Sequence, residues 1–409
     1  MFKAIRESRT RRRLARPHLR AGILRGRSAG TGSRGLPHVN NEFQNSQIRV
    51  LIVDDSAFMR TALSRMVAAD SDLSVAGTAS TGAEAMQKVA SLDPDVITLD
   101  VQMPGMDGLE TLRGIMAKFP RPVIMVSSVT LKEAEITFNA LEAGAFDYVP
   151  KQLSGTSLDI LHIREDLIDK IKAAAESWRS RVRFPVTKKP PRPADVHPQH
   201  PLRNATVVVA LGVSTGGPNA LQEILPFFPA DLPVPILVVQ HMPVGFTAPF
   251  AERLNHLCAV SIREASHGEL VHPGVVYIAP AGYHLTVSRP TDLRTVIFLS
   301  NERREQQHVP SVDIMMQSVA SAFRSRAMGV IMTGMGSDGA QGMNAIHREG
   351  GFTLGQDEPT CAVYGMPRVC AEMGILDRVV PLYQIPAEIL QAASYGKTAT
   401  EISVKTSAS

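Results

Sequence analysis

Residues 48–56, which read IRVLIVDDS, contain the repeating unit of the first half of the chain. An apolar run of strand length ends in two acids, and a stretch with helical periodicity follows. The same alternation predicts further strands over residues 73–78, 96–99, 123–126 and 146–149, each followed by a helix. Alternating strands and helices predict a parallel sheet covered by helices on both faces, the doubly wound α/β arrangement.

A second α/β series begins at residues 206–213, another apolar run of strand length. We expect its other strands over residues 236–240, 275–279, 284–288, 295–299 and 330–333. This order predicts a three-layer α/β/α domain with a mostly parallel sheet and a short antiparallel section. We therefore divide the chain into an Arg-rich, disordered extension (1–46), a first domain (47–172), a Pro-rich linker (173–204), a second domain (205–395) and a tail (396–409).

Composition and charge narrow the class of protein. The 409 residues are 44% hydrophobic, which suits two domains with their own cores. Of the net charge of +4, residues 1–46 carry +9, so the rest of the chain carries −5, which gives no reason to expect a nucleic-acid partner. Three cysteines without metal-ligand spacing, and no apolar run long enough to cross a bilayer, favour a cytoplasmic protein that is not membrane-embedded.

Five polar residues follow strands of the first predicted sheet: Asp54 and Asp55, Asp100, Ser127 and Lys151. The carboxyl ends of parallel strands meet at one edge, so we expect these side chains to share a pocket. Clustered carboxylates repel one another unless a cation lies among them, and Mg²⁺ prefers oxygen ligands. Helix capping could explain any single acid, but not all five positions together.

Four segments carry a resemblance to the response-regulator receiver family: LIVDDSAFMR (51–60), DVQMPGMDG (100–108), IMVSS (124–128) and DYVPK (147–151). The resemblance implies a flavodoxin-like (βα)5 domain in which Asp100 accepts a phosphoryl group from a histidine kinase. It implies a Mg²⁺ site formed by Asp54, Asp55, Asp100 and the Gln102 carbonyl. Ser127 and Lys151 would be the switch hydroxyl and the phosphate-pairing lysine. Gln152 replaces the family's usual proline, which leaves the local turn open.

The second domain carries a serine at a Gly-rich turn between a strand and a helix, GVSTGGP (212–218). Such a turn could bind a phosphate or present a nucleophile, but it matches neither dinucleotide nor P-loop spacing. A nucleophilic Ser214 needs a base and an orienting acid. His241 follows the strand 236–240, and Asp338 follows the strand 330–333, so all three lie at the same edge of the sheet.

The second domain contains other histidines and acids that could serve as base or orienting acid. Spacing alone does not decide between them and the set of Ser214, His241 and Asp338. His267 and His272 lie in a predicted loop and His256 on a helix, while Asp357 also follows a strand. Asp313 is interpreted as a helix N-terminal acid and Cys361 as an inert thiol.

The second domain resembles the catalytic domain of the chemotaxis protein-glutamate methylesterase family. The resemblance is carried by GVSTGGP, VVQHMPVGFT (238–247), PSVDIMMQSVA (310–320), TGMGSDGAQGM (333–343) and QDEPTCAVYGMP (356–367). It implies a Ser214–His241–Asp338 serine hydrolase that demethylates glutamyl γ-methyl esters of chemotaxis receptors without a cofactor for hydrolysis, and also deamidates receptor glutamines. The Met335 N–H is our candidate oxyanion donor.

We expect a monomer in which the unphosphorylated receiver covers the Ser214 crevice, and phosphorylation of Asp100 loosens this contact through the linker. The main alternative is a phosphorylation-controlled receptor-binding adaptor without catalysis, against which the presence of all three triad residue types argues. A DNA-binding response regulator would instead need a basic helix-turn-helix after the linker, and the second α/β series does not fit it.

Overall fold

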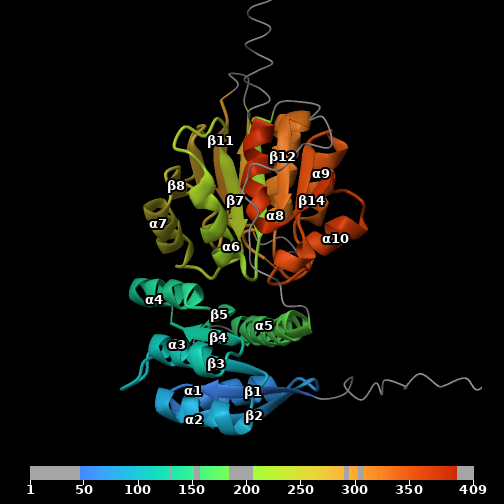
Figure 1. Cartoon of the computed structure of the whole chain (residues 1–409). Helices are drawn as coiled ribbons and strands as arrows, with labels where there is room; N and C mark the ends of the chain where they lie inside the picture. The colour runs from blue at the N-terminus through green and yellow to red at the C-terminus, as the bar shows by residue number, and fades with distance from the viewer. Residues whose placement is uncertain are drawn as a thin grey trace, which may run out of the picture. The chain divides into compact units, whose positions relative to one another are not determined.

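The computed structural model describes residues 47–128, 130–151, 157–183, 206–289, 294–302 and 308–393 (Figure 1). The predicted extension over residues 1–46 and the predicted tail from residue 396 lie outside these ranges, as does the part of the linker over residues 184–204. No helix in the described ranges is long and apolar enough to cross a membrane.

The first half forms one parallel five-stranded sheet in the order β2-β1-β3-β4-β5. Its strands are β1 (Ile48–Val53), β2 (Leu73–Ala79), β3 (Val96–Asp100), β4 (Val123–Ser127) and β5 (Asp147–Pro150). Its helices are α1 (Ala57–Ala68), α2 (Gly82–Leu92), α3 (Gly108–Lys118), α4 (Leu131–Glu142) and α5 (Ser157–Arg183). The expected doubly wound fold is confirmed, and the strand bounds agree with the predicted ones to within a residue or so.

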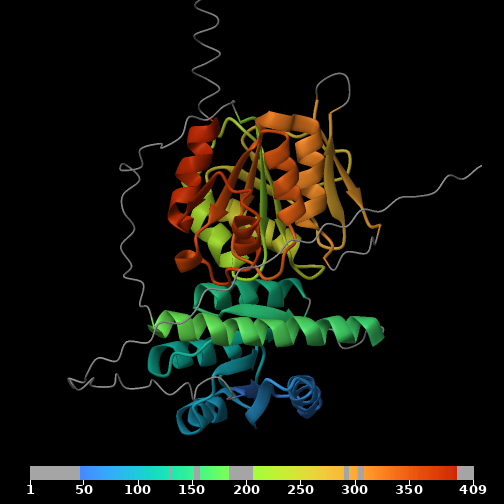
Figure 2. The same cartoon turned by 90° about the vertical axis from the view of Figure 1, so that its right-hand side faces the viewer.

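Helix α5 runs further than the sequence interpretation allowed (Figure 2, long green helix). It extends to Arg183, so the first residues of the predicted 173–204 linker are helical instead of extended. Leu167, Ile171 and Ala174 recur at intervals of three and four residues and are fully buried in the core of the first sheet. This apolar stripe continues into the residues that we assigned to the linker, which accounts for the longer helix.

The second half contains a parallel seven-stranded sheet in the order β14-β13-β12-β6-β7-β9-β8, and a separate antiparallel pair. The sheet strands are β6 (Val208–Val213), β7 (Ile236–Gln240), β8 (Ser261–Glu264), β9 (Val275–Ile278), β12 (Ala327–Ile331), β13 (Phe352–Gln356) and β14 (Arg378–Val380). The antiparallel pair is β10 (His284–Ser288) and β11 (Val296–Ser300). The helices are α6 (Gly217–Ile224), α7 (Thr247–Leu257), α8 (Val312–Phe323), α9 (Ala340–Arg348) and α10 (Met366–Glu372).

The predicted fold class of the second half is confirmed, with differences in detail. The strand predicted over residues 330–333 lies at Ala327–Ile331. The sequence pattern does not predict its start, because Gly329 is a poor strand former. Glycine is needed at this position because β12 packs closely against α9. A Cβ on Gly329 would lie 2.6 Å from the Met343 Sδ. The short strands β8 and β14 were not predicted, since neither shows a run of alternating or continuous apolar residues.

The register of the sheet fixes which loops meet. Val213 of β6 pairs with Gln240 of β7, and Gly212 of β6 pairs with Ile331 of β12. The residues that follow these three strands therefore emerge side by side at the carboxyl edge of the sheet.

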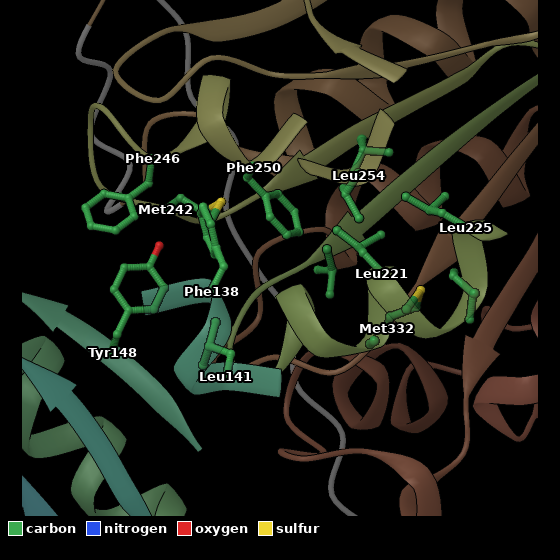
Figure 3. Packing of buried hydrophobic residues seen from close by; sticks show 14 of the residues in the cluster. Phe138, Leu141, Tyr148, Leu221, Leu225, Met242, Phe246, Phe250, Leu254 and Met332 are labelled. Atoms are coloured by element: carbon green, nitrogen blue, oxygen red, sulfur yellow. The ribbon is translucent and has the colours of Figure 1, made fainter. Parts of the chain in front are cut away.

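Buried aromatic side chains of the first half pack against those of the second half (Figure 3). Phe138 of α4 lies with its ring centroid 5.2 Å from that of Phe250 and 6.2 Å from that of Phe246. Tyr148 of β5 lies 4.8 Å from Phe246 by the same measure. All four side chains are at most 2% exposed, so the receiver-like sheet and the second sheet share one continuous apolar cluster here.

We predict that Thr353→Val lowers the free energy of unfolding by about 1–3 kcal/mol. Thr353 is fully buried at the start of β13, and its hydroxyl contacts the Ile375 carbonyl at 2.7 Å and the Asp377 carboxylate at 2.8 Å. Valine keeps the shape of the side chain but removes the hydroxyl that lies between these two oxygens and that also accepts a hydrogen bond from the Asp377 N–H. Urea unfolding should detect the loss. Thr286→Val, at a partly exposed position with one 3.4 Å contact, is the matched control and should change stability by less than about 0.5 kcal/mol. Equal effects of the two substitutions would contradict the prediction.

Candidate functional sites

The first site lies at the carboxyl edge of the five-stranded sheet. Val53 of β1 pairs with Leu99 of β3, so the next residues, Asp54 and Asp100, lie side by side on neighbouring strands. Lys151, which follows β5, places its Nζ 2.6 Å from the Asp100 Oδ2 and 3.1 Å from the Asp54 Oδ2. The structure therefore brings the predicted lysine and two of the predicted acids into direct contact.

Three carboxylates at this edge are close enough to share one ion. Asp54, Asp55 and Asp100 each offer an oxygen within 4.8 Å of the others. Gln102 and Asp55 line the same pocket, and the Gln102 N–H donates to the Asp100 Oδ1 at 3.1 Å. Burial raises the pKa of Asp100 to about 6, helped by the charge of Asp54 and opposed by Lys151. Because Asp100 is buried among other acids, its carboxylate is costly to ionise. A bound cation would stabilise the ionised form, so the pocket suits a cation.

The predicted switch hydroxyl is buried beside the first site. Ser127 ends β4 and accepts a hydrogen bond from the Thr137 hydroxyl of α4 at 2.8 Å. The Thr137 Oγ1 also lies 2.7 Å from the Glu133 carbonyl oxygen. Sequence reasoning missed Thr137, because a threonine inside a helical pattern carries no signal of a partner on the sheet. This hydrogen bond connects Ser127 directly to α4.

The second site is built on the sharp turn that follows β6. The Ser214 N–H donates to the Thr333 carbonyl at 3.0 Å, and the Ser214 carbonyl accepts from Gly217 at 2.8 Å. Gly216 has φ +74°, and a Cβ there would lie 2.3 Å from the Ala362 Cβ, so glycine is required for both reasons. Helix α6 begins at Gly217, which places Ser214 at its N-terminal end.

Three predicted side chains meet at the second site. His241 Nδ1 lies 3.1 Å from the Ser214 Oγ, and His241 Nε2 lies 2.9 Å from the Asp338 Oδ2. The base of a serine triad more often faces the serine through Nε2. Here the Nε2–H tautomer is needed, because the proton must lie towards Asp338 and leave the Nδ1 lone pair to accept from Ser214.

Asp338 is fixed by the first turn of α8. The Val312 N–H donates to its Oδ2 at 2.7 Å, while the Ser311 hydroxyl and the Asp313 N–H donate to its Oδ1 at 2.9 and 3.0 Å. Burial would raise the pKa of Asp338, but the hydrogen bond and charge of His241 and these backbone donors hold it at about 2. The carboxylate is therefore ionised throughout the neutral range and can stabilise an imidazolium.

His308 is a further residue of the second site, and sequence reasoning missed it. Its ring stacks on His241 with 4.1 Å between centroids and 17° between planes. Desolvation and the neighbouring His241 lower the pKa of His308 to about 4, so the ring is neutral at pH 7. Nothing in its spacing from Ser214 or Asp338 distinguishes His308 from the other histidines of the second half.

The rival residues lie elsewhere. His267 contacts Leu299 of β11, His256 lies in the last turn of α7, and Asp357 caps the short helix Glu358–Thr360. Asp313 is in the first turn of α8, as expected, and accepts from the Gly342 N–H. Burial raises the pKa of the Cys361 thiol well above its ordinary value, which keeps it protonated.

The turn over residues 333–336 lies directly against Ser214. A Cβ on Gly334 would lie 2.8 Å from the Ser214 Cβ, and the Gly334 carbonyl accepts from the Gly365 and Met366 N–H groups. The Thr333 N–H is bound by Gln356, and the Thr333 hydroxyl donates to the Thr215 carbonyl. Backbone atoms of Thr333 and Gly334 therefore lie next to the serine, while the Met335 N–H stays a predicted oxyanion donor.

Comparisons with known proteins agree over both halves. Residues 209–389 match the model of the CheB methylesterase family, and residues 50–161 match that of the response regulator receiver domain. A protein-glutamate methylesterase/protein-glutamine glutaminase of Oleidesulfovibrio alaskensis is 44% identical over 84% of this chain and 99% of its own. One of Geobacter sulfurreducens is 44% identical over 85% and 98%. The Thermotoga maritima CheB catalytic domain is 39% identical over 46% of this chain and 99% of its own, with a TM-score of 0.45. The chain therefore belongs to the family of CheB methylesterases that carry a response regulator receiver domain.

Proposed function

We propose that this chain hydrolyses γ-methyl esters of glutamate in chemotaxis receptors, with Ser214, His241 and Asp338 as its catalytic triad. The hydrogen-bonded chain from the Ser214 Oγ through His241 to the Asp338 carboxylate supports this proposal most directly. An adaptor without catalysis would have no need for a buried imidazole held between a hydroxyl and an ionised acid.

The reaction begins when His241 Nδ1 accepts the Ser214 proton and the serine oxygen attacks the ester carbonyl. The tetrahedral intermediate collapses with transfer of that proton to the leaving oxygen, so methanol departs and an acyl-serine remains. Water, deprotonated by His241, then attacks the acyl group, and the serine leaves with a proton from the imidazolium. Asp338 stabilises the imidazolium in both steps, and the Met335 N–H donates to the oxyanion. The same groups would release ammonia from a glutamine side chain.

The receiver half controls this ester hydrolysis through phosphorylation of Asp100. Asp54, Asp55, Asp100 and the Gln102 carbonyl would hold Mg²⁺, which neutralises charge between the Asp100 carboxylate and an incoming phosphoryl group from a histidine kinase. Lys151 already contacts Asp100 and would pair with the phosphoryl oxygens. Ser127 would move towards the same oxygens and give up its hydrogen bond from Thr137 of α4.

Contacts of α4 and β5 with the catalytic half support inhibition by the unphosphorylated receiver. The Arg253 side chain of α7 lies 2.6 Å from the Glu142 carboxylate and donates to the Asn139 Oδ1 at 3.0 Å. Burial raises the pKa of Asp147, opposed by the charge of Lys170, by the Tyr148 N–H and, to a smaller extent, by a hydrogen bond from the Thr215 side chain. Asp147 therefore lies against the residue that follows the nucleophile. We propose a receiver domain that runs from residue 47 to the end of α5 at Arg183, a catalytic domain over residues 205–395, and a monomer that acts in the cytoplasm.

Ser214→Ala should abolish methanol release from methylated receptor, because no other hydroxyl in the described site faces His241. Phosphorylation of Asp100 should continue, since the two sites are on different sheets. Gas chromatography of methanol and mass spectrometry of the phosphoprotein test both statements in one preparation. Retained methanol release by the folded variant would reject Ser214 as the nucleophile.

Asp338→Asn should lower kcat by about 10³–10⁴-fold. The asparagine amide can donate to His241 Nε2, which favours the Nδ1–H tautomer and leaves no lone pair for the Ser214 proton. Asp313→Asn is the matched control, because Asp313 also lies in the first turn of α8 but accepts from α9. It should stay within a few-fold of the parent. Steady-state kinetics on methylated receptor would contradict the assignment if the two variants lost activity equally.

Glu142→Ala combined with Asn139→Ala should raise the esterase activity of the unphosphorylated chain several-fold, because Arg253 loses both partners on α4. Glu135→Ala, at an exposed position of the same helix, should not. Asp100→Ala should remove the response to acetyl phosphate. The proposed inhibition is wrong if the double variant keeps the parental basal rate, or if the Asp100→Ala chain still responds.

A further inference from the structure

Gln240 is a buried polar side chain beside the triad for which the proposed reaction has no role. It is the last residue of β7 and only 2% exposed. Its Nε2 donates to the Ser214 carbonyl at 3.0 Å and to the His241 carbonyl at 2.9 Å. One amide group thus contacts the backbones of the nucleophile and of the base at once.

The orientation of this amide is determined by its surroundings. Two carbonyl oxygens face one end of the group, and only the NH₂ can donate to both. The other end, Oε1, is packed against α6, where a Cβ on Gly217 would lie 2.0 Å from it. Among the described residues, this Oε1 has no hydrogen-bond partner.

An unpaired buried carbonyl oxygen is unfavourable, and an apolar side chain at this position would avoid it. A buried polar group that is only half satisfied calls for an explanation other than stability. The two donated hydrogen bonds provide one. The strand pairing holds Val213 against Gln240, and the His241 N–H donates to the Val213 carbonyl at 3.2 Å. The Gln240 side chain extends this connection to Ser214, on the turn beyond the strand.

We propose that Gln240 is a positioning residue that fixes the distance between the Ser214 Oγ and His241 Nδ1. It acts through the backbones of these residues and does not contact the substrate. The inference rests on the proposed triad. A shift of about 1 Å between reacting groups can cost about 10²-fold in rate, so such a brace would act on the chemical step.

Gln240→Met tests the inference in the full-length chain. Methionine nearly preserves the side-chain volume and removes both donors, so kcat should fall about 10- to 100-fold with KM unchanged. The rate constant for labelling of Ser214 by a fluorophosphonate should fall by a similar factor, per folded molecule. Gln240→Glu should lose more than Gln240→Met, because a carboxylate would face the two carbonyl oxygens.

Thr353→Val is the matched control for a loss of buried hydrogen bonds. It lies at the amino end of β13, at the edge of the same sheet away from the triad, and should keep the parental kcat and labelling rate. A Gln240→Met chain within twofold of the parent, or one whose loss equals its unfolded fraction, would overturn the inference. Ser214→Ala distinguishes a failure of the proposed function from a failure of the role of Gln240. Esterase activity in the Ser214→Ala variant would contradict the proposed function. An inactive Ser214→Ala variant together with a fully active Gln240→Met variant would contradict only the role of Gln240.

Discussion

The geometry of the proposed catalytic triad depends on one carboxylate being held at the start of a helix. Asp338 accepts hydrogen bonds from the Ser311 hydroxyl and from two N–H groups of the first turn of α8. The hydrogen bond and charge of His241, together with these donors, keep Asp338 ionised despite burial, and the donors fix where its oxygens point. His241 can then present only Nδ1 to Ser214, so the direction of the imidazole follows from the position of α8.

In both halves, the candidate site lies at the carboxyl edge of a parallel sheet. In each parallel sheet, polar residues follow neighbouring strands, and strand register brings them together. The receiver edge gathers acids and a lysine, which suits an ion and a phosphoryl group. The other edge gathers an alcohol, an imidazole and an acid, which suits acyl transfer. Helix α4 connects the two, because it touches Ser127 through Thr137 and α7 through Asn139 and Glu142.

This connection gives a physical route from phosphorylation to ester hydrolysis. A phosphoryl group on Asp100 would attract Ser127 and change the hydrogen bonding of α4. The aromatic cluster of Phe138, Tyr148, Phe246 and Phe250 is closely packed, so small movements of α4 or β5 would disturb contacts across it. Tyr148 and Asp147 belong to the strand that precedes Lys151, which places the phosphate partner and the interface on one short segment.

Both α/β folds could be predicted from the amino-acid sequence, because strand and helix periods, and the acids and Gly-rich turns that follow the strands, are local features. Strand positions also made Asp100, Ser214, His241 and Asp338 candidates, but spacing alone left rivals to the triad open, and the family resemblance selected among them. The fold was needed to show which ring nitrogen of His241 faces Ser214, the stack of His308 on His241, and the hydrogen bond of Gln240 to the Ser214 carbonyl. It also showed that α5 continues beyond residue 172, where Ala173, Ala174 and Ala175 are buried in the first half. These features depend on contacts between residues far apart in the chain, and local sequence patterns do not encode such contacts.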